Sequence, residues 1–347
     1  MKKQIVLSFI AAIVFLVGLV VMVGFNLEMP PLPQATESAT AEPSLPATEP
    51  PTQPPTQPPT EPPTQPPTEP PTEPPTQPPA EVWAPADLGL DAKYAFVYNK
   101  TEERLVYAGG DQTKKVAPAS LTKLLTAYVA LEHMELDKVI TVGDEIWWID
   151  PNSSVAWLGS GYRMTVEMLI QGLLMQSGND AAYALAVAGG RAISGNANLA
   201  ARSALSVFMK EMNATAKELG MHNTYFVNPD GIDTAGHYTT MEDLLTLSRA
   251  IVEHPVIMRY CGMATAKVTV VSGQSLSWEN SNYLLSTKYG FYNENCIGLK
   301  TGSTSGAGKC LISYFDDGQQ QLLIAVLACP DDNSRYNDTL YLLEKYS

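Results

Sequence analysis

The stretch Pro118-Ala119-Ser120-Leu121-Thr122-Lys123 opens a predicted helix that runs through about Glu132 and is buried on most sides. Residues three apart share a helix face, so the Lys123 amine can lie beside the Ser120 hydroxyl. The amides and dipole at a helix start favour negative charge, which suits a nucleophilic serine and the oxyanion that it forms with a carbonyl. Taken alone, the segment also fits an ordinary N-cap serine followed by an exposed lysine.

A second motif, Ser177-Gly178-Asn179, lies in the break between two predicted helices over residues 164–175 and 180–187. A glycine between two short polar residues predicts a turn that pushes side chains into a cleft. The same pattern fits a helix C-cap followed by an N-cap, and the two interpretations are compatible.

A third motif, Lys300-Thr301-Gly302, ends a predicted strand over residues 296–302. The lysine and threonine supply a cation and a hydroxyl, and the glycine lets a substrate backbone lie close against the strand. The alternative is a solvent-exposed edge. In this order, the three motifs supply the parts of one acyl-transfer site. The predicted roles are nucleophile and base for Ser120 and Lys123, proton shuttle and positioner for Ser177 and Asn179, and carboxylate clamp for Lys300-Thr301-Gly302.

The rest of residues 82–347 is predicted to contain both strands and helices, enough for one large domain or a two-lobed one. Strands over 94–98 and 104–108 should form a hairpin. Helices are expected over 205–219 and 240–253, with the turn signal Asn228-Pro229-Asp230-Gly231 between them. Strands over 309–314 and 322–328 follow, joined by a turn at 316–318, and residues 341–346 belong to a closing helix.

Composition and charge argue against several classes of function. The net charge is −14 and no basic run occurs beyond Lys2-Lys3, which argues against a nucleic-acid partner. The four histidines lie far apart and no spacing is typical of metal ligands, so neither a metal site nor a cofactor is predicted. An exported chain could form two disulfides, but a domain of this size does not need them, and we expect buried thiols. The four cysteines are Cys261, Cys296, Cys310 and Cys329.

Residues 1–28 are predicted to be a cytoplasmic N-terminus and a transmembrane signal-anchor. The uncharged apolar run Ile5–Phe25 has 21 residues, which as a helix spans roughly 30 Å, the thickness of bilayer hydrocarbon. Lys2 and Lys3 precede the run, so the N-terminus should stay in the cytoplasm and the rest should cross. The alternative is a cleaved signal peptide and a secreted domain, although the run does not end in an Ala-x-Ala-like site.

Residues 29–81 form a Pro/Thr-rich segment that we interpret as a spacer. From Pro50 to Gln77 the unit Pro-Pro-Thr-Gln/Glu repeats seven times. Proline at this density forbids helix and sheet and favours polyproline II, in which the repeat would reach on the order of 90 Å. A docking site for a proline-binding module and a glycosylated stalk are the alternatives.

Several sequence blocks, in order, resemble those of the serine-type D-Ala-D-Ala carboxypeptidases, the low-molecular-mass penicillin-binding proteins. The resemblance covers roughly residues 85–345. It implies an α/β (α+β) fold of the β-lactamase/transpeptidase-like type, with a mainly antiparallel sheet flanked by helices, an all-helical lobe, and the site in the cleft between them. It also implies a bacterial cell-wall enzyme acting on peptidoglycan stem peptides, with β-lactams as covalent inhibitors. The blocks span residues 118–123, 177–182, 228–231, 280–285 and 298–302.

The resemblance further implies that Ser120 attacks the carbonyl between the two terminal D-alanines. Lys123 must be neutral to take the serine proton, and we expect burial and the second cation Lys300 to lower its pKa. Lys300 and Thr301 would bind the terminal carboxylate, and the amides of Ser120 and Ser303 would form the oxyanion hole. Many relatives carry a bulky residue in place of Ser303, a difference expected to tune the pocket rather than abolish the chemistry.

Three other functions fit parts of this pattern. An endopeptidase would cut peptidoglycan cross-links in the same site. A class A β-lactamase would need a Glu-x-x-Leu-Asn loop, and the nearest match, Glu242-Asp243-Leu244-Leu245-Thr246, lacks the Asn and is predicted to be helical. A non-catalytic β-lactam sensor or wall-binding module should have lost a motif, and none is lost.

Overall fold

The computed structural model describes residues 88–347. The predicted anchor (residues 1–28), the predicted spacer (residues 29–81) and the first six residues of the predicted catalytic domain (82–87) lie outside the described residues. Within residues 88–347, no helix combines the length and the apolar character needed to cross a bilayer.

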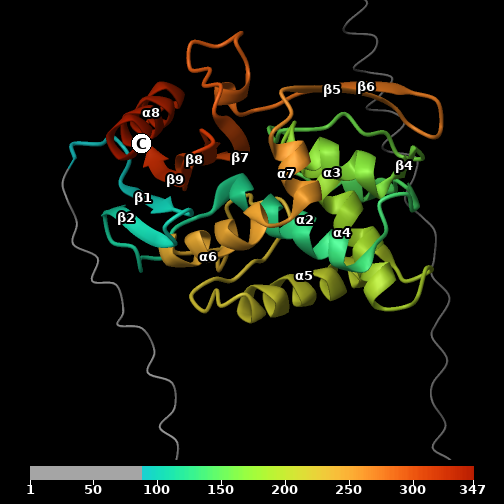
Figure 1. The fold of residues 1–347 in the computed structure, drawn as a ribbon. Helices are drawn as coiled ribbons and strands as arrows, with labels where there is room; N and C mark the ends of the chain where they lie inside the picture. Colours follow the sequence, from blue (N-terminus) through green and yellow to red (C-terminus); the bar gives the residue numbers. More distant parts are fainter. Residues whose placement is uncertain (1–87) are drawn as a thin grey trace, which may run out of the picture. The chain divides into compact units, whose positions relative to one another are not determined.

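A five-stranded antiparallel sheet forms one lobe, with its strands in the order β2-β1-β9-β8-β7 (Figure 1). β1 (Tyr94–Asn99) and β2 (Arg104–Gly109) form the predicted hairpin. β7 (Cys296–Thr304), β8 (Gly308–Asp316) and β9 (Gln321–Cys329) are antiparallel neighbours in chain order. β1 pairs with β9, so the first and last strands of the described region lie side by side at the centre of the sheet.

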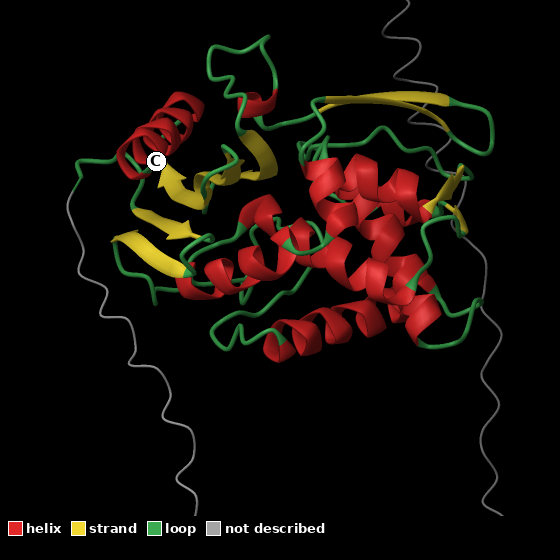
Figure 2. Ribbon diagram, viewed as in Figure 1, coloured by secondary structure: helices red, strands yellow, loops and turns green. Residues whose placement is uncertain are grey.

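Successive residues of β9 enter two different cores, because side chains alternate between the faces of a strand. Leu323 and Leu327 pack with the helical lobe, whereas Ile324 and Val326 pack under α8 (Asp332–Tyr346). Helices therefore cover both faces of the sheet, as Figure 2 shows. All four cysteines are buried free thiols, in agreement with the favoured interpretation of the sequence.

The second lobe is helical and is centred on α4 (Asn179–Ile193), which contacts α2 (Thr122–His133), α3 (Val166–Leu174) and α5 (Ala201–Glu218). Alanine and glycine dominate α4 and allow this close packing. A Cβ on Gly190 would come within 1.9 Å of the Ala204 carbonyl oxygen in α5. α6 (Met241–Val252) and α7 (Pro255–Cys261) lie between this lobe and the sheet (Figure 1).

Two short hairpins differ from the prediction. The helix expected from Met164 begins at Val166, because β4 (Arg163–Thr165) pairs with β3 (Val139–Thr141). The Thr165 side chain then caps α3 by accepting a hydrogen bond from the Met168 amide. β5 (Thr265–Thr269) and β6 (Ser275–Glu279) form a second hairpin that was not predicted. The helix expected over 180–187 continues to Ile193.

Candidate active site

The segment that carries the predicted nucleophile begins with a short 3-10 turn. Ala119–Leu121 form this turn, η1, and α2 follows at Thr122. Ser120 therefore lies immediately before the helix and Lys123 lies in its first turn. Lys123 Nζ donates a hydrogen bond of 2.7 Å to Ser120 Oγ. The two side chains thus meet in the way that their spacing predicts.

Lys123 is fully buried, which excludes the alternative of an exposed lysine beside a capping serine. Its amine also donates a 2.5 Å hydrogen bond to the Asp230 carbonyl oxygen. Burial lowers the pKa of Lys123 to about 8, while the negative charges of Asp230 and Asp180 oppose the shift. An amine with this pKa has a substantial neutral fraction near neutral pH and can accept the proton of Ser120.

Ser177 and Gly178 form the break before α4, and Asn179 is the first residue of that helix. The Asn179 amide donates to the Ser154 carbonyl oxygen at 2.8 Å, which fixes this turn against a neighbouring loop. Ser177 is buried and has a left-handed φ of 59°. Its hydroxyl is not hydrogen-bonded to Ser120, to Lys123 or to any other described residue. It is therefore available to exchange a proton with a bound molecule.

Lys300 and Thr301 are both buried, although β7 is an edge strand. The alternative of a solvent-exposed edge is therefore wrong for these two residues. Thr301 Oγ1 shares a 2.6 Å hydrogen bond with Ser281 Oγ, and Lys300 Nζ donates to the Thr301 carbonyl oxygen at 3.0 Å. β7 continues to Thr304, because its ladder with β8 extends to the pair Thr304–Gly308. The prediction that the motif ends the strand is corrected accordingly.

Burial lowers the pKa of both lysines. The pKa of Lys300 is lowered well below its ordinary value, first by burial and then by the positive charge of Lys123. The lowered pKa of Lys123 comes first from burial. Because two like charges disfavour each other mutually, this interaction is consistent with the expectation that Lys300 lowers the pKa of Lys123.

Gly302 lets the nucleophile segment pack closely against β7. A Cβ at this position would lie 3.1 Å from the Ala119 Cβ, 3.3 Å from the Pro118 carbonyl oxygen and 3.4 Å from the Cys310 Cβ. The missing side chain therefore lets β7 lie directly against η1. This contact places β7, which carries Lys300 and Thr301, beside the segment that carries Ser120.

A cavity of about 420 Å³ opens beside the nucleophile. Ser120, Asn179 and Ser303 line it, together with parts of the loops over residues 150–154, 230–233 and 304–305. Lys123 reaches Ser120 from the buried side. The cavity therefore gathers one residue from each of the first two sequence motifs and Ser303, which directly follows the third, around one opening.

The turn Asn228-Pro229-Asp230-Gly231 packs directly against the nucleophile, which the sequence did not indicate. Gly231 has a left-handed φ of 89°, and a Cβ there would lie 1.8 Å from the Ala119 carbonyl oxygen. Asp230 is 1% exposed, and its Oδ2 has no hydrogen-bond partner among residues 88–347. Burial raises the pKa of the Asp230 carboxyl and the charge of Lys123 lowers it.

Two further charged residues near the site were not predicted. Asp233 accepts hydrogen bonds of 2.7 Å from Thr304 Oγ1 and from the Gly306 amide, and so fixes the turn between β7 and β8. Arg335 of α8 is 5% exposed and points at the Gly302 carbonyl oxygen from 3.4 Å. Its fixed positive charge contributes to the lowered pKa of Lys300. Nothing in the sequence indicates that a charged residue near the start of the last helix lies beside the Gly302 carbonyl.

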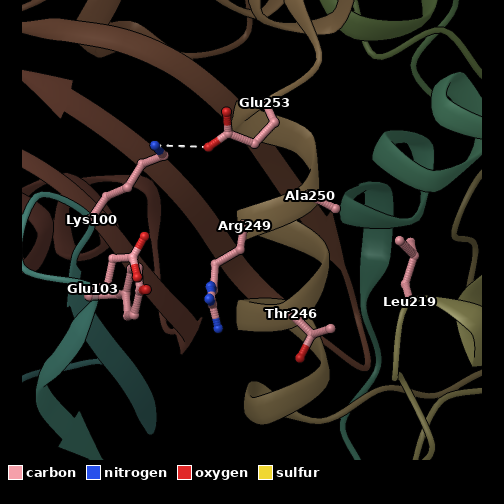
Figure 3. Close-up of a pocket in the computed structure, with 8 residues that line it drawn as sticks. Lys100, Glu103, Leu219, Thr246, Arg249, Ala250 and Glu253 are labelled. Carbon is pink, nitrogen blue, oxygen red and sulfur yellow. Dashed lines mark ion pairs between the residues drawn. The ribbon is translucent and has the colours of Figure 1, made fainter.

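A separate cavity of about 350 Å³ lies between the β1–β2 hairpin and α6 (Figure 3). It contains an ion pair of 2.8 Å between Lys100 and Glu253, and the Arg249 guanidinium stacks over the Tyr98 ring. None of the predicted site residues lines it. Its charged groups lack an activated nucleophile, so the cavity at Ser120 is the better candidate for chemistry.

Comparison with known proteins gives one consistent family. Residues 81–331 match the family model described as D-alanyl-D-alanine carboxypeptidase. The D-alanyl-D-alanine carboxypeptidase DacC of Escherichia coli (strain K12) is 34% identical over 249 residues, which cover 69% of this chain and 57% of DacC. The chain thus spans little more than half the length of that relative.

Solved structures agree on the fold. The crystal structure of the Streptomyces K15 DD-transpeptidase matches with a TM-score of 0.66 at 27% identity, over 74% of this chain and 96% of that one. Penicillin-binding protein D2 from Listeria monocytogenes, in an ampicillin-bound form, matches with a TM-score of 0.60 at 28% identity, over 75% and 98%. The predicted fold class, an antiparallel sheet with helices in the transpeptidase-like arrangement, is confirmed.

Proposed function

The chain belongs to the D-alanyl-D-alanine carboxypeptidase family, and from that premise we propose that it hydrolyses the terminal D-Ala-D-Ala bond of peptidoglycan stem pentapeptides through a serine acyl-enzyme. The observation that carries the proposal is the 2.7 Å hydrogen bond between the buried Lys123 amine and the Ser120 hydroxyl. A serine beside an amine with a lowered pKa is an activated nucleophile.

In the acylation step, Ser120 Oγ attacks the carbonyl carbon of the penultimate D-alanine and gives its proton to neutral Lys123. The amides of Ser120 and Ser303 face the developing oxyanion, at the start of α2 where the helix dipole favours negative charge. The C–N bond then breaks, and the leaving amine receives a proton, with Ser177 as the relay. Its unpartnered hydroxyl supports that role.

The leaving D-alanine carries a carboxylate, which Lys300 and Thr301 would bind. Burial and the charge of Lys123 lower the pKa of Lys300. An arriving carboxylate raises that pKa, because a nearby opposite charge favours the charged form. Arg335 adds a permanent positive charge behind the same strand. Binding of the carboxylate and charging of Lys300 are thus coupled.

In the deacylation step, water attacks the carbonyl carbon of the ester. The hydroxyl of the water stays on the acyl group, and the remaining proton of the water returns to Ser120 through Lys123. The products are D-alanine and a tetrapeptide. A β-lactam would acylate Ser120 in the same way, but its leaving amine stays attached to the ring fragment and keeps water out. We therefore propose β-lactams as covalent inhibitors.

We also propose that residues 1–28 anchor the chain in a bacterial cell membrane and that residues 29–81 hold the catalytic domain on its outer side. The support is the apolar run, the preceding lysines and the proline repeat. Immunoblotting of cell fractions tests this. A full-length band in the membrane fraction supports the anchor, and a shortened band in the medium supports the cleaved alternative.

The function is tested by incubating the protein with a defined disaccharide pentapeptide and measuring free D-alanine and the tetrapeptide product. The unaltered protein should release one D-alanine for each tetrapeptide formed. Ser120→Ala should release none. Absence of D-alanine release by a folded protein that binds its substrate would refute the proposed activity.

A further inference from the structure

One acid of the active site, Asp230, has a side chain that takes no part in the acylation step. Asp230 lines the cavity beside Ser120, and only 1% of its surface is exposed. Its Oδ1 accepts a hydrogen bond of 3.3 Å from the Ile232 amide, whereas its Oδ2 has no hydrogen-bond partner among residues 88–347. Buried carboxylate oxygens in folded proteins almost always have a partner, so an exception beside a nucleophile calls for a functional explanation.

The turn that carries Asp230 is held firmly against the nucleophile segment. The Gly231 amide donates a 2.8 Å hydrogen bond to Asn228 Oδ1, which closes the turn on itself. On the other side of Asp230, Thr126 Oγ1 of α2 donates a 2.7 Å hydrogen bond to the Pro229 carbonyl oxygen. The backbone is therefore fixed both before and after Asp230, and the position of the carboxyl group is a built part of the site.

The carboxyl group of Asp230 acts on both Lys123 and α4. Burial lowers the pKa of Lys123, and the negative charge of Asp230 opposes this shift. Burial raises the pKa of the Tyr183 hydroxyl on α4, and the charge of Asp230 raises it further. Tyr183 is about one helical turn after Asn179, which lines the same cavity as Ser120. These interactions place the carboxyl group at the cavity wall, near both the base and the start of α4.

Water is the partner that fits Asp230 Oδ2. The oxygen is enclosed, so only a small hydrogen-bond donor can reach it. Buried waters are held by about two to four polar partners. Asp230 Oδ2 supplies one acceptor, and the polar side chain of Asn179 lines the same cavity. Deacylation requires a water at this place, because the ester that the water attacks is carried by Ser120.

We propose that Asp230 is the general base of deacylation. The inference rests on the proposed function, because it concerns the same acyl-enzyme. Asp230 Oδ2 accepts a proton of the water while the water oxygen bonds to the carbonyl carbon of the ester. The bond from that carbon to Ser120 Oγ then breaks, and the charged Lys123 amine donates a proton to Ser120 Oγ. The proton on Asp230 passes to Lys123, which restores both groups.

The two bases suit different steps. Lys123 takes the serine proton when it is neutral, but its pKa of about 8 leaves most of it charged at pH 7. A charged amine cannot accept a proton from water. Burial raises the pKa of the Asp230 carboxyl, but the positive charge of Lys123 opposes this shift and favours the ionised carboxylate. The state in which Lys123 cannot act as a base is thus the state in which Asp230 can.

The experiment separates the two steps by following both products over time. A disaccharide pentapeptide is mixed with the protein, and D-alanine and the tetrapeptide are measured by rapid quench and liquid chromatography. Asp230→Asn keeps the shape of the side chain but removes the base. This variant should release one D-alanine per molecule at least as fast as the unaltered protein, and should then turn over on the order of 100-fold more slowly. Mass spectrometry should show the acyl group on the variant.

Hydroxylamine distinguishes a missing base from disturbed packing, because it attacks an ester without the help of a general base. Added to Asp230→Asn, it should raise turnover by about tenfold or more, with the acyl hydroxamate as the product. Asp317→Asn is the control, because it removes an equal charge from the exposed turn between β8 and β9. It should behave as the unaltered protein does.

Two results would overturn the inference while the proposed function stands. One is an Asp230→Asn variant that turns over at the unaltered rate or is no longer acylated, although the unaltered protein releases D-alanine. The other is a slow variant that hydroxylamine does not accelerate, because the loss would then come from disturbed packing. If the unaltered protein releases no D-alanine, the proposed function fails and the inference fails with it.

Discussion

Asp230→Asn tests how the site prepares its base. Lys123 must be neutral to take the serine proton, and its pKa is about 8. About a tenth of the protein would then carry a neutral Lys123 at pH 7, and this fraction sets the rate of acylation on the acid side. Asp230, while ionised, holds the pKa of Lys123 up, and Asn has the same shape without the charge. Removing a nearby opposite charge should lower the pKa of Lys123 by about one unit or more.

The sign and size of the effect follow directly. A lower pKa means that Lys123 is neutral at lower pH, so the rising limb of the rate profile moves to lower pH. About half of the variant would be neutral at pH 7, which predicts roughly fivefold faster acylation there. Above about pH 9 the two proteins should react at similar rates, because Lys123 is then neutral in both.

The other charged and titratable groups around Lys123 do not change in this experiment. Asp180 and Lys300 face it from α4 and β7. The pKa of His237 is lowered to about 4, mainly by burial, so this ring stays neutral over the range used. The control is Asp317→Asn, which removes an equal charge from the exposed turn between β8 and β9.

The assay is the second-order rate of labelled penicillin attachment, measured from about pH 5.5 to 9.5. Asp317→Asn should follow the unaltered protein at every pH. The reasoning is refuted if the Asp230→Asn limb stays in place or moves to higher pH. A flat profile of the unaltered protein between pH 6 and 9 would refute the role of Lys123 itself.

Three more changes have defined outcomes. Gly231→Ala would place a Cβ 1.8 Å from the Ala119 carbonyl oxygen and should slow penicillin attachment on the order of 100-fold. Gly236→Ala is the control, because Gly236 has a similar φ of 85° but a Cβ there would lie 3.8 Å from its nearest neighbour, and it should retain the rate. Lys300→Gln should lower kcat/KM for a pentapeptide with a free C-terminal carboxylate by roughly 10- to 100-fold. The effect on the same pentapeptide with a C-terminal amide should be much smaller, since only the carboxylate pairs with the positive charge of Lys300. Leu124→Ala, at a fully buried position, should lower the free energy of unfolding by about 2–5 kcal/mol in urea denaturation, and a loss below 1 kcal/mol would contradict the described packing.

Contacts and elements that depend on local spacing could be predicted from the sequence. The three-residue interval between Ser120 and Lys123 predicts their contact, and the apolar run over residues 322–328 predicts a strand. Strands and helices with strong periodicity were therefore placed correctly. Short paired segments such as 139–141 and 163–165 were missed, because their stability comes from a partner distant in the chain.

Contacts made by residues outside the three motifs could not be predicted from the sequence, because they form only between segments that are distant in the chain. Asp230 lies 107 residues from Lys123, and only the fold brings its carbonyl oxygen to the amine. The close packing of Gly302 against Ala119 likewise joins two segments that are far apart in the chain.

The central claim is that Ser120 becomes covalently acylated with Lys123 as its base. Incubation with a labelled penicillin, followed by proteolysis and mass spectrometry of the peptides, measures this directly. We predict one adduct per molecule, located on Ser120, with no labelling of Ser120→Ala and greatly slowed labelling of Lys123→Met. An adduct on another residue, or full labelling of Ser120→Ala, would contradict the account.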